Sequence, residues 1–264
     1  MRYSTGDAVT EVQSPVVLRM LDIDLDFFVR GVAYWPTQTE RLDDTDYPAW
    51  SLEDAIVFLE EGCALTGPLP GFVVTNHGEL FARWRTAIES GALTAPFSVT
   101  HVDAHADLGM GDLGYLHLMT ELLFEEPENR CYPEMGIRGF GDGNFLAFAI
   151  ACRWLSDLLV VYNDDGGNDV MRYHMQNFDI TAENLQLKAV RPDEMKEKLL
   201  GGNPAAERTE PLVPFATTPW NLYQARVPFD VICLAQSPPY TPAGADAIFD
   251  EIRHRFIDES AFSI

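Results

Sequence analysis

The chain has 264 residues, of which 47% are hydrophobic and 11% aromatic, so it can bury a packed core and is not a disordered protein. Its 41 acidic residues outnumber 18 basic ones, giving a formal net charge of -23. This charge argues against nucleic acid or an anionic membrane surface as a partner, and it favours cationic molecules or metal ions.

Other features of the sequence predict a cytoplasmic protein. The four cysteines are scattered without a C-x-x-C pair, so we expect neither a zinc ribbon nor a disulfide framework, and a reducing compartment fits. Residues 1–14 lack the basic and apolar regions of a signal peptide. The most apolar segment, 145–162, is interrupted by charged residues and is not expected to span a membrane.

Strand and helix patterns alternate along the chain. In order, we expect a strand at 16–26, a helix at 52–61, a strand at 71–75, a helix at 79–89, a strand at 97–103, a helix at 145–155, a strand at 158–162, a helix at 193–200, a strand at 229–235 and a helix at 243–256. This alternation predicts a three-layer α/β/α fold with a mostly parallel sheet. Residues 1–264 are expected to form a single domain, with the Pro-, Gly- and Thr-rich segment 201–228 as a loop excursion.

The first expected strand carries a ladder of acids in "MLDIDLDFF", residues 20–28. Asp22, Asp24 and Asp26 occupy every second position of an otherwise apolar run. Alternate residues of a strand share one face, so the three carboxylates are predicted to lie on one side of the strand and the apolar residues on the other.

A second cluster, "HVDAHADL" at residues 101–108, repeats this spacing with His101, Asp103, His105 and Asp107. If the strand ends near Asp103, the last three of these leave its carboxyl end, where ligands bind in open parallel sheets. His77, in "VVTNHGELF", follows another short strand and is expected at the same edge, although a lone histidine there can also be purely structural.

The alternative for any single aspartate is a salt bridge or a solvated place on an edge strand. For the combination, two carboxylates about 4 Å apart repel by about 4 kcal/mol at an effective dielectric of 20. No lysine or arginine lies at residues 22–28 or 99–115. Bound metal is therefore the simplest source of compensating charge, and carboxylates with some imidazoles and no thiolate suit Mn²⁺, Fe²⁺ or Mg²⁺. A hydroxide bridging two such ions would be a nucleophile toward trigonal carbon.

These motifs resemble those of the arginase and agmatinase ureohydrolases. "VDAHADL" is similar to their D-A-H-x-D signature, "DIDLD" to their S-x-D-x-D strand, and "NHGE" to the step that supplies their isolated histidine ligand. The set as a whole resembles more closely the peptide arginases, which convert arginine side chains of ribosomally made precursor peptides into ornithine and urea. The resemblance covers the three motifs and "ICLAQSPPYTP", and leaves about 125–225 unmatched.

The resemblance implies an arginase/deacetylase-like fold and two Mn²⁺ ions. The residues that match the family's metal ligands are Asp24, Asp26, His77, Asp103, His105 and Asp107. In this register Asp22 takes the place of a serine or threonine and supports the ligating imidazoles from behind. The alternative register shifts the ligand pair by two residues, to Asp22 and Asp24.

The chain departs from the ureohydrolases in two ways. Its D-x-D strand precedes the D-A-H-x-D motif, so the chain order would be permuted around the same sheet. The last strand also offers only Gln236 and Ser237 where arginases hold the guanidinium with a carboxylate. Glu79 is the expected substitute, and a role in the first turn of its helix is the alternative.

His117 is expected to protonate the leaving amine, with a plain helix-surface histidine as the alternative.

The sequence therefore predicts a binuclear amidinohydrolase that acts on an arginine-containing precursor peptide. The alternatives are a small-molecule ureohydrolase for agmatine or free arginine, an amide deacetylase of the same fold, and a metal or peptide-binding module without catalysis. No nucleic acid or membrane partner is expected, and the oligomeric state is not predicted.

Overall fold

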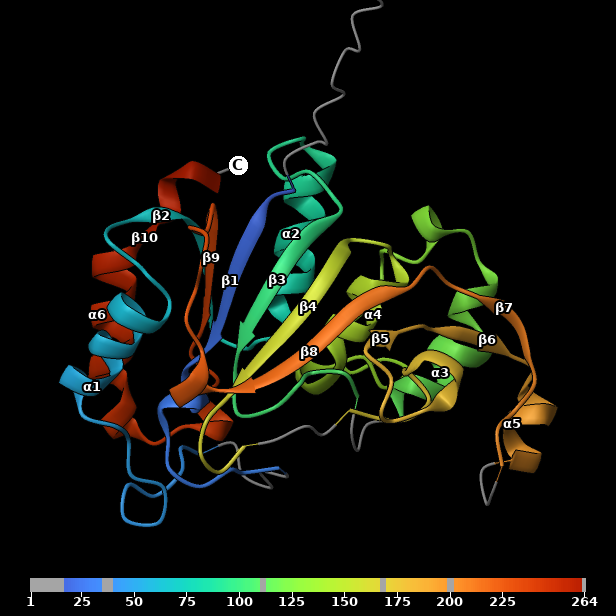
Figure 1. The fold of residues 1–264 in the computed structure, drawn as a ribbon, viewed down its shortest axis with the longest axis horizontal. Coiled ribbons are helices and arrows are strands. Elements are labelled where there is room, and N and C mark those ends of the chain that lie inside the picture. Colours follow the sequence, from blue (N-terminus) through green and yellow to red (C-terminus); the bar gives the residue numbers. More distant parts are fainter. Residues whose placement is uncertain (1–16, 35–39, 110–112, 167–169, 199–201, 263–264) are drawn as a thin grey trace, which may run out of the picture.

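The computed structural model describes residues 17–34, 40–109, 113–166, 170–198 and 202–262. An eight-stranded sheet runs through it in the order β10-β2-β9-β1-β3-β4-β8-β5 (Figure 1). Its strands are β1 (Arg19–Asp24), β2 (Leu69–Val74), β3 (Phe97–Val102), β4 (Leu155–Tyr162), β5 (Asn184–Leu185), β8 (Val213–Pro219), β9 (Val231–Ala235) and β10 (Ile257–Asp258). All neighbours pair in parallel except β5 and β8. The predicted α/β class with a mostly parallel sheet is confirmed.

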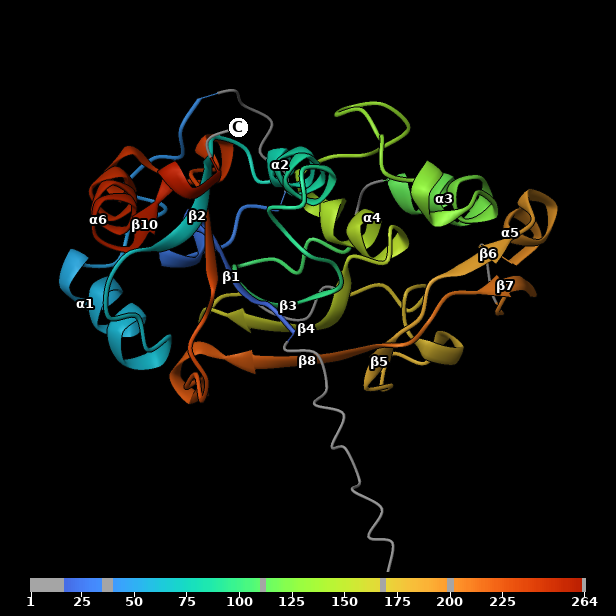
Figure 2. The same cartoon turned by 90° about the horizontal axis from the view of Figure 1, so that it is seen from above.

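Helices cover both faces of the sheet (Figure 2). They are α1 (Leu52–Val57), α2 (Glu79–Glu89), α3 (Gly114–Thr120), α4 (Phe145–Ala151), α5 (Pro192–Lys198) and α6 (Asp246–Phe256). On one face, Met20 of β1 packs in a core with Trp84 of α2 and Phe145 of α4. On the other, Leu21 of β1 packs in a second core with Ile248 of α6. The period-2 pattern of β1 thus divides its side chains between two cores.

The strand that carries the first two acids of the ladder ends earlier than the sequence predicts. β1 ends at Asp24, and residues Leu25–Phe28 form a 3₁₀ helix. The Asp24 side chain accepts a hydrogen bond from the backbone N–H of Asp26 at 3.2 Å, which caps this turn. An aspartate that bonds the backbone two residues ahead favours a turn over a strand. Asp26 therefore does not continue the ladder face.

The segment 201–228, expected to be a loop excursion, contains two strands. One of them, β7 (Ala206–Thr209), forms an antiparallel ribbon with β6 (Lys188–Val190). The other, β8, belongs to the main sheet and pairs in parallel with β4. Val213 and Phe215 are buried while Pro214 is exposed, which is the alternation of a strand. The prolines hide this pattern in the sequence. They are tolerated because they lie at the ends of the pairing with β4: Pro214 precedes its first residue, Phe215, and Pro219 is its last.

The parallel register aligns the carboxyl ends of the central strands. Asp22 of β1 pairs with His101 of β3 on one side and with Cys233 of β9 on the other. Because all three strands run in the same direction, the residues that follow them emerge at one edge of the sheet. This edge holds the polar cluster described next.

Candidate metal centre

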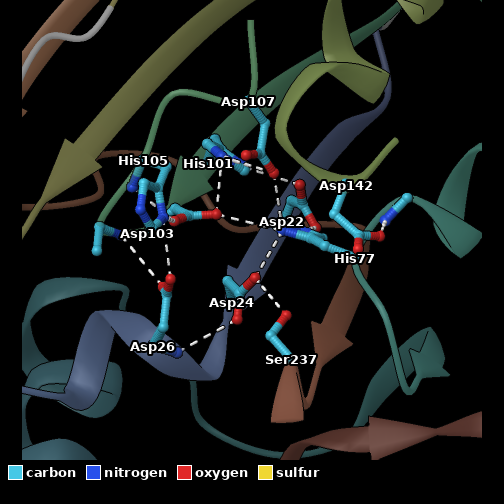
Figure 3. A network of polar contacts seen from close by, with 12 residues as sticks. Asp22, Asp24, Asp26, His77, His101, Asp103, His105, Asp107, Asp142 and Ser237 are labelled. Carbon is cyan, nitrogen blue, oxygen red and sulfur yellow. Dashed lines mark hydrogen bonds and ion pairs between the residues drawn. The ribbon is translucent and has the colours of Figure 1, made fainter. Parts of the chain in front are cut away.

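The polar cluster is built from the ends of β1, β2 and β3 (Figure 3). β1 supplies Asp22 and Asp24, the turn after β2 supplies His77, and β3 supplies His101. Asp103, His105 and Asp107 follow in the loop that leaves β3, and Asp26 comes from the 3₁₀ helix after β1. All of these residues are buried except His105, which is 14% exposed at its side chain.

A first group of ligand atoms comes from His77, His101, Asp103 and Asp107, whose atoms all lie within 4.8 Å of one another. The Nδ1 of His77 is 3.2 Å from Asp103 Oδ2 and 3.0 Å from Asp107 Oδ2. The Nε2 of His101 is 3.1 Å from the same oxygen of Asp103. Two imidazoles and two carboxylates therefore converge on one point.

A second group comes from Asp26, Asp103 and His105. The Nδ1 of His105 lies 3.0 Å from Asp26 Oδ2 and 3.4 Å from Asp103 Oδ1. Asp103 thus belongs to both groups, with Oδ2 toward the first and Oδ1 toward the second. Its orientation is fixed locally, because Oδ1 also accepts the backbone N–H of His105 at 2.7 Å.

Asp22 lies behind the two imidazoles of the first group. Its Oδ1 is 3.2 Å from Nε2 of His77, and its Oδ2 is 2.9 Å from Nδ1 of His101. A carboxylate that accepts a hydrogen bond from one ring nitrogen leaves the other nitrogen free to face a metal. Asp22 is therefore placed to orient both rings.

Asp24 stands beside the first group. Its Oδ2 is 2.9 Å from Nδ1 of His77 and accepts a hydrogen bond from Ser237 Oγ at 2.6 Å. The converging atoms of the first group include His101, which the sequence did not assign as a ligand, and do not include Asp24, which it did.

The cluster shifts the pKa values of its own members. For Asp22, burial alone would raise the pKa, but His77 and His101 bring it below the usual value. For His101, burial would lower the pKa, but Asp103 and Asp22 raise it to about 10. Burial and the charge of Asp103 raise the pKa of Asp107 to about 7. Without another cation, the histidines hold protons to offset the buried carboxylates.

The Nδ1 of His77 and the Nε2 of His101 both lie within 3.2 Å of Oδ2 of Asp103, but among the described residues none of these three atoms makes a hydrogen bond of ordinary geometry. Buried polar atoms in this condition are rare in folded proteins. Carboxylate oxygens with imidazole nitrogens are ligands for divalent cations such as Mn²⁺. The buried residues His77, His101, Asp103, Asp107 and Asp26 could therefore hold a metal ion.

Glu79 lies close to the cluster in sequence, but its carboxylate is engaged elsewhere. Its Oε1 accepts a hydrogen bond from Asn76 Nδ2 at 3.0 Å, and its Oε2 accepts the backbone N–H of Thr75 at 3.4 Å. It begins α2, where a carboxylate reaching back to the preceding residues stabilises the first turn. The geometry therefore favours the alternative expectation for Glu79, a role in the first turn of its helix.

His117 is not brought into the cluster. It lies on α3, where its Nδ1 is 3.2 Å from the carboxylate of the exposed Glu121. It lines a surface hollow that also includes Arg138 and Tyr132. Figures 1 and 2 place α3 toward the β6–β7 ribbon, away from the carboxyl ends of β1 and β3.

Three further residues border the cluster. Asp142 lies beside His77, where its Oδ1 accepts the backbone N–H of Gly78 at 2.9 Å, and burial raises its pKa (Figure 3). Tyr34 and Tyr240 place their rings 5.2 Å and 5.6 Å from the His105 ring. All three lie in irregular segments or short 3₁₀ turns, where no periodic pattern marks a functional residue. For this reason the sequence did not assign them to the metal site.

Fold and cluster together define an α/β protein with a buried carboxylate and imidazole site at the carboxyl edge of a parallel sheet. Comparisons with protein-family models, with curated proteins and with solved structures gave no match. In the part of the chain that the structure describes, no helix has the length and apolar character needed to cross a membrane.

Proposed function

We propose that the protein is a dimanganese amidinohydrolase that converts arginine side chains of a ribosomally made precursor peptide into ornithine, with release of urea. The proposal combines the motif resemblance with the arrangement of the cluster. The observation that carries it is the position of Asp103, whose two oxygens face two different groups of ligand atoms. A shared carboxylate is the arrangement expected of a two-metal site.

Two divalent ions at these groups would supply Lewis acidity and activate a water molecule at neutral pH. The protein supplies the orientation of the ligands. Asp22 accepts hydrogen bonds from His77 and His101, and Phe145 covers the His77 ring with their centroids 4.8 Å apart. The buried surroundings exclude bulk water from the site and strengthen its electrostatic interactions.

A guanidinium substrate also needs a carboxylate to hold its positive charge. We assign this role to Asp142 in place of Glu79, since the Glu79 oxygens are engaged in the first turn of α2. One oxygen of Asp142 is fixed by Gly78 at the edge of the cluster, and charge-assisted hydrogen bonds between a carboxylate and a guanidinium are strong and directional.

The activity is tested by incubating the Mn²⁺-loaded protein with an arginine-containing peptide, and in parallel with free arginine and agmatine. The proposal predicts urea, together with loss of CH₂N₂ from the peptide for each modified arginine by mass spectrometry. A peptide with lysine at the same positions is the substrate control. The Asp103→Asn variant should form no urea, whereas the Glu126→Gln variant, changed at an exposed site outside the cluster, should be as active as the unaltered protein. Release of urea only from free arginine or agmatine would favour the small-molecule alternative.

A further inference from the structure

A large surface groove lies near the candidate metal centre and takes no part in it. The cavity has a volume of about 930 Å³, toward the upper end of the range of about 300–1,000 Å³ for ligand pockets. Its walls come from α1, from the loop after β4 and from the turn after β8. Figures 1 and 2 both show α1 beside that turn, and the backbone N–H of Ala225 donates to the carbonyl of Gly62 at 2.7 Å.

Aromatic side chains form one part of the groove. Trp220, which follows β8, lies 4.8 Å from Trp50 and 6.1 Å from Phe58, measured between ring centroids. Two aliphatic side chains on the same lining are exposed to solvent: Leu222 at 77% and Val57 at 45%. Exposed apolar side chains beside aromatic rings are a common feature of protein interaction sites.

Carboxylates form another part of the groove lining. Asp54, Glu61, Asp164 and Asp165 contribute to the described lining, against one basic residue, Arg30. Asp164 also accepts a hydrogen bond from Trp220 Nε1 at 2.9 Å, so the aromatic and acidic parts are joined. Cations are attracted both by carboxylates and by the faces of tryptophan rings.

The groove and the metal centre share a wall. Asn163, in the groove lining, donates hydrogen bonds to the carbonyls of Phe27 and Val29, on either side of the last residue of the 3₁₀ helix that carries Asp26. The loop after β4, which carries Asn163, also packs against the loop after β3, since a Cβ on Gly166 would lie 2.8 Å from the carbonyl oxygen of Ala104. Both sites therefore lie at the carboxyl edge of the sheet and share these loops.

We infer that this groove binds a basic segment of a peptide, with lysine or arginine side chains against its carboxylates and apolar side chains against its tryptophans. The identification of this peptide as the substrate rests on the proposed function. The binding itself does not, because the groove uses none of the candidate metal ligands. A chain in the groove would be held beside the site while one of its arginines enters.

The test measures binding of a fluorescent peptide of lysine, serine and leucine to the metal-free protein, so that neither hydrolysis nor arginine recognition contributes. We expect the Asp54→Asn/Glu61→Gln variant to bind about three- to tenfold more weakly, as expected for loss of two exposed charge contacts. Both side chains are exposed, and the new amides can still accept hydrogen bonds. Glu126→Gln/Glu128→Gln removes the same charge from exposed positions outside the groove lining and should bind like the unaltered protein.

The single variant Glu61→Lys changes the charge of the groove by the same two units and should weaken binding to a similar extent, with Glu128→Lys as its matched control. Binding should also weaken as NaCl rises from about 50 to about 500 mM, because exposed charges are screened. Equal affinity of the groove and control variants would overturn the inference, as would equal binding of a peptide with glutamate in place of lysine, or no binding at all. Urea formation with no effect of the groove variants on peptide binding would refute the groove alone. Groove-dependent binding without urea formation would refute the hydrolase alone.

Discussion

Asp22 and His101 are paired residues of adjacent parallel strands, and Oδ2 of Asp22 lies 2.9 Å from Nδ1 of His101. The same carboxylate reaches Nε2 of His77 with its other oxygen. One buried side chain thus sets the direction of two imidazoles, and each ring turns its remaining nitrogen toward the same carboxylates.

The Asp22→Asn substitution should weaken Mn²⁺ binding about 10- to 100-fold, the usual effect of losing the group that orients a metal-binding histidine. The amide cannot accept hydrogen bonds from both rings with both of its ends, so one ring is left unsupported. Isothermal titration calorimetry with Mn²⁺ measures the change. An unchanged dissociation constant would show that Asp22 does not orient the ligands.

The His101→Ala variant should lose most of its metal affinity, whereas His117→Ala should keep it. His101 contributes a converging nitrogen to the first ligand group, and His117 lies on α3 in contact with Glu121. The two variants make the same chemical change at a buried and at a partly exposed histidine. Metal content after dialysis against Mn²⁺ compares them, and equal retention by both would exclude His101 as a ligand.

The metal-free protein should lose stability as the pH rises. The pKa of His101 is about 10 in the folded state and 6.5 for the ordinary group. The stability that protonated His101 contributes is therefore complete below pH 6.5 and is lost by about pH 10. Asp107, with its pKa raised to about 7 from 3.8, acts in the same direction at lower pH, because its protonated form is favoured in the folded state.

Thermal denaturation followed by circular dichroism should show this as a falling Tm from about pH 6.5 upward in the metal-free protein. The increase in Tm on adding Mn²⁺ should become larger over the same range, because metal and protons compete for the imidazoles. A metal-induced increase that shrinks as the pH rises would contradict the proposed ligand set.

Asp142→Asn should raise KM for an arginine-containing peptide about 10- to 100-fold, since hydrogen bonds to a charged group contribute about 1.5–3 kcal/mol. Mn²⁺ affinity should stay close to that of the unaltered protein, because Asp142 is not among the converging ligand atoms. Glu79→Gln is the matched control near His77. It keeps an acceptor for the first turn of α2 and should leave KM unchanged, whereas an equal effect of both variants would remove the assignment of Asp142.

The sequence predicts those features that depend on strand periodicity and on the geometry of parallel sheets. The spacing of "DIDLD" and "DAHAD" places carboxylates at strand ends, and parallel pairing brings those ends to one edge. The order of the strands in the sheet does not follow from periodicity. The position of His101 opposite Asp22 therefore required the structure, because it depends on pairing between residues 79 positions apart.

Local features explain the other differences between the predicted and the observed structure. Asp26 leaves the strand because Asp24 caps a turn, which no alternation of apolar residues reveals. β8 is hidden by its prolines, and Asp142 begins a short 3₁₀ turn where glycines on either side obscure any pattern. Residues whose roles arise from tertiary contacts in irregular segments are the ones that the sequence leaves out.

The central claim is that Asp103 is shared by two metal ions, and equilibrium dialysis with Mn²⁺ tests it most directly through the number of ions bound per chain. A two-metal site predicts two ions for the unaltered protein, one for His105→Ala, which removes a ligand of the second group alone, and none for Asp103→Ala. A single ion in the unaltered protein, or two ions in Asp103→Ala, would contradict the account.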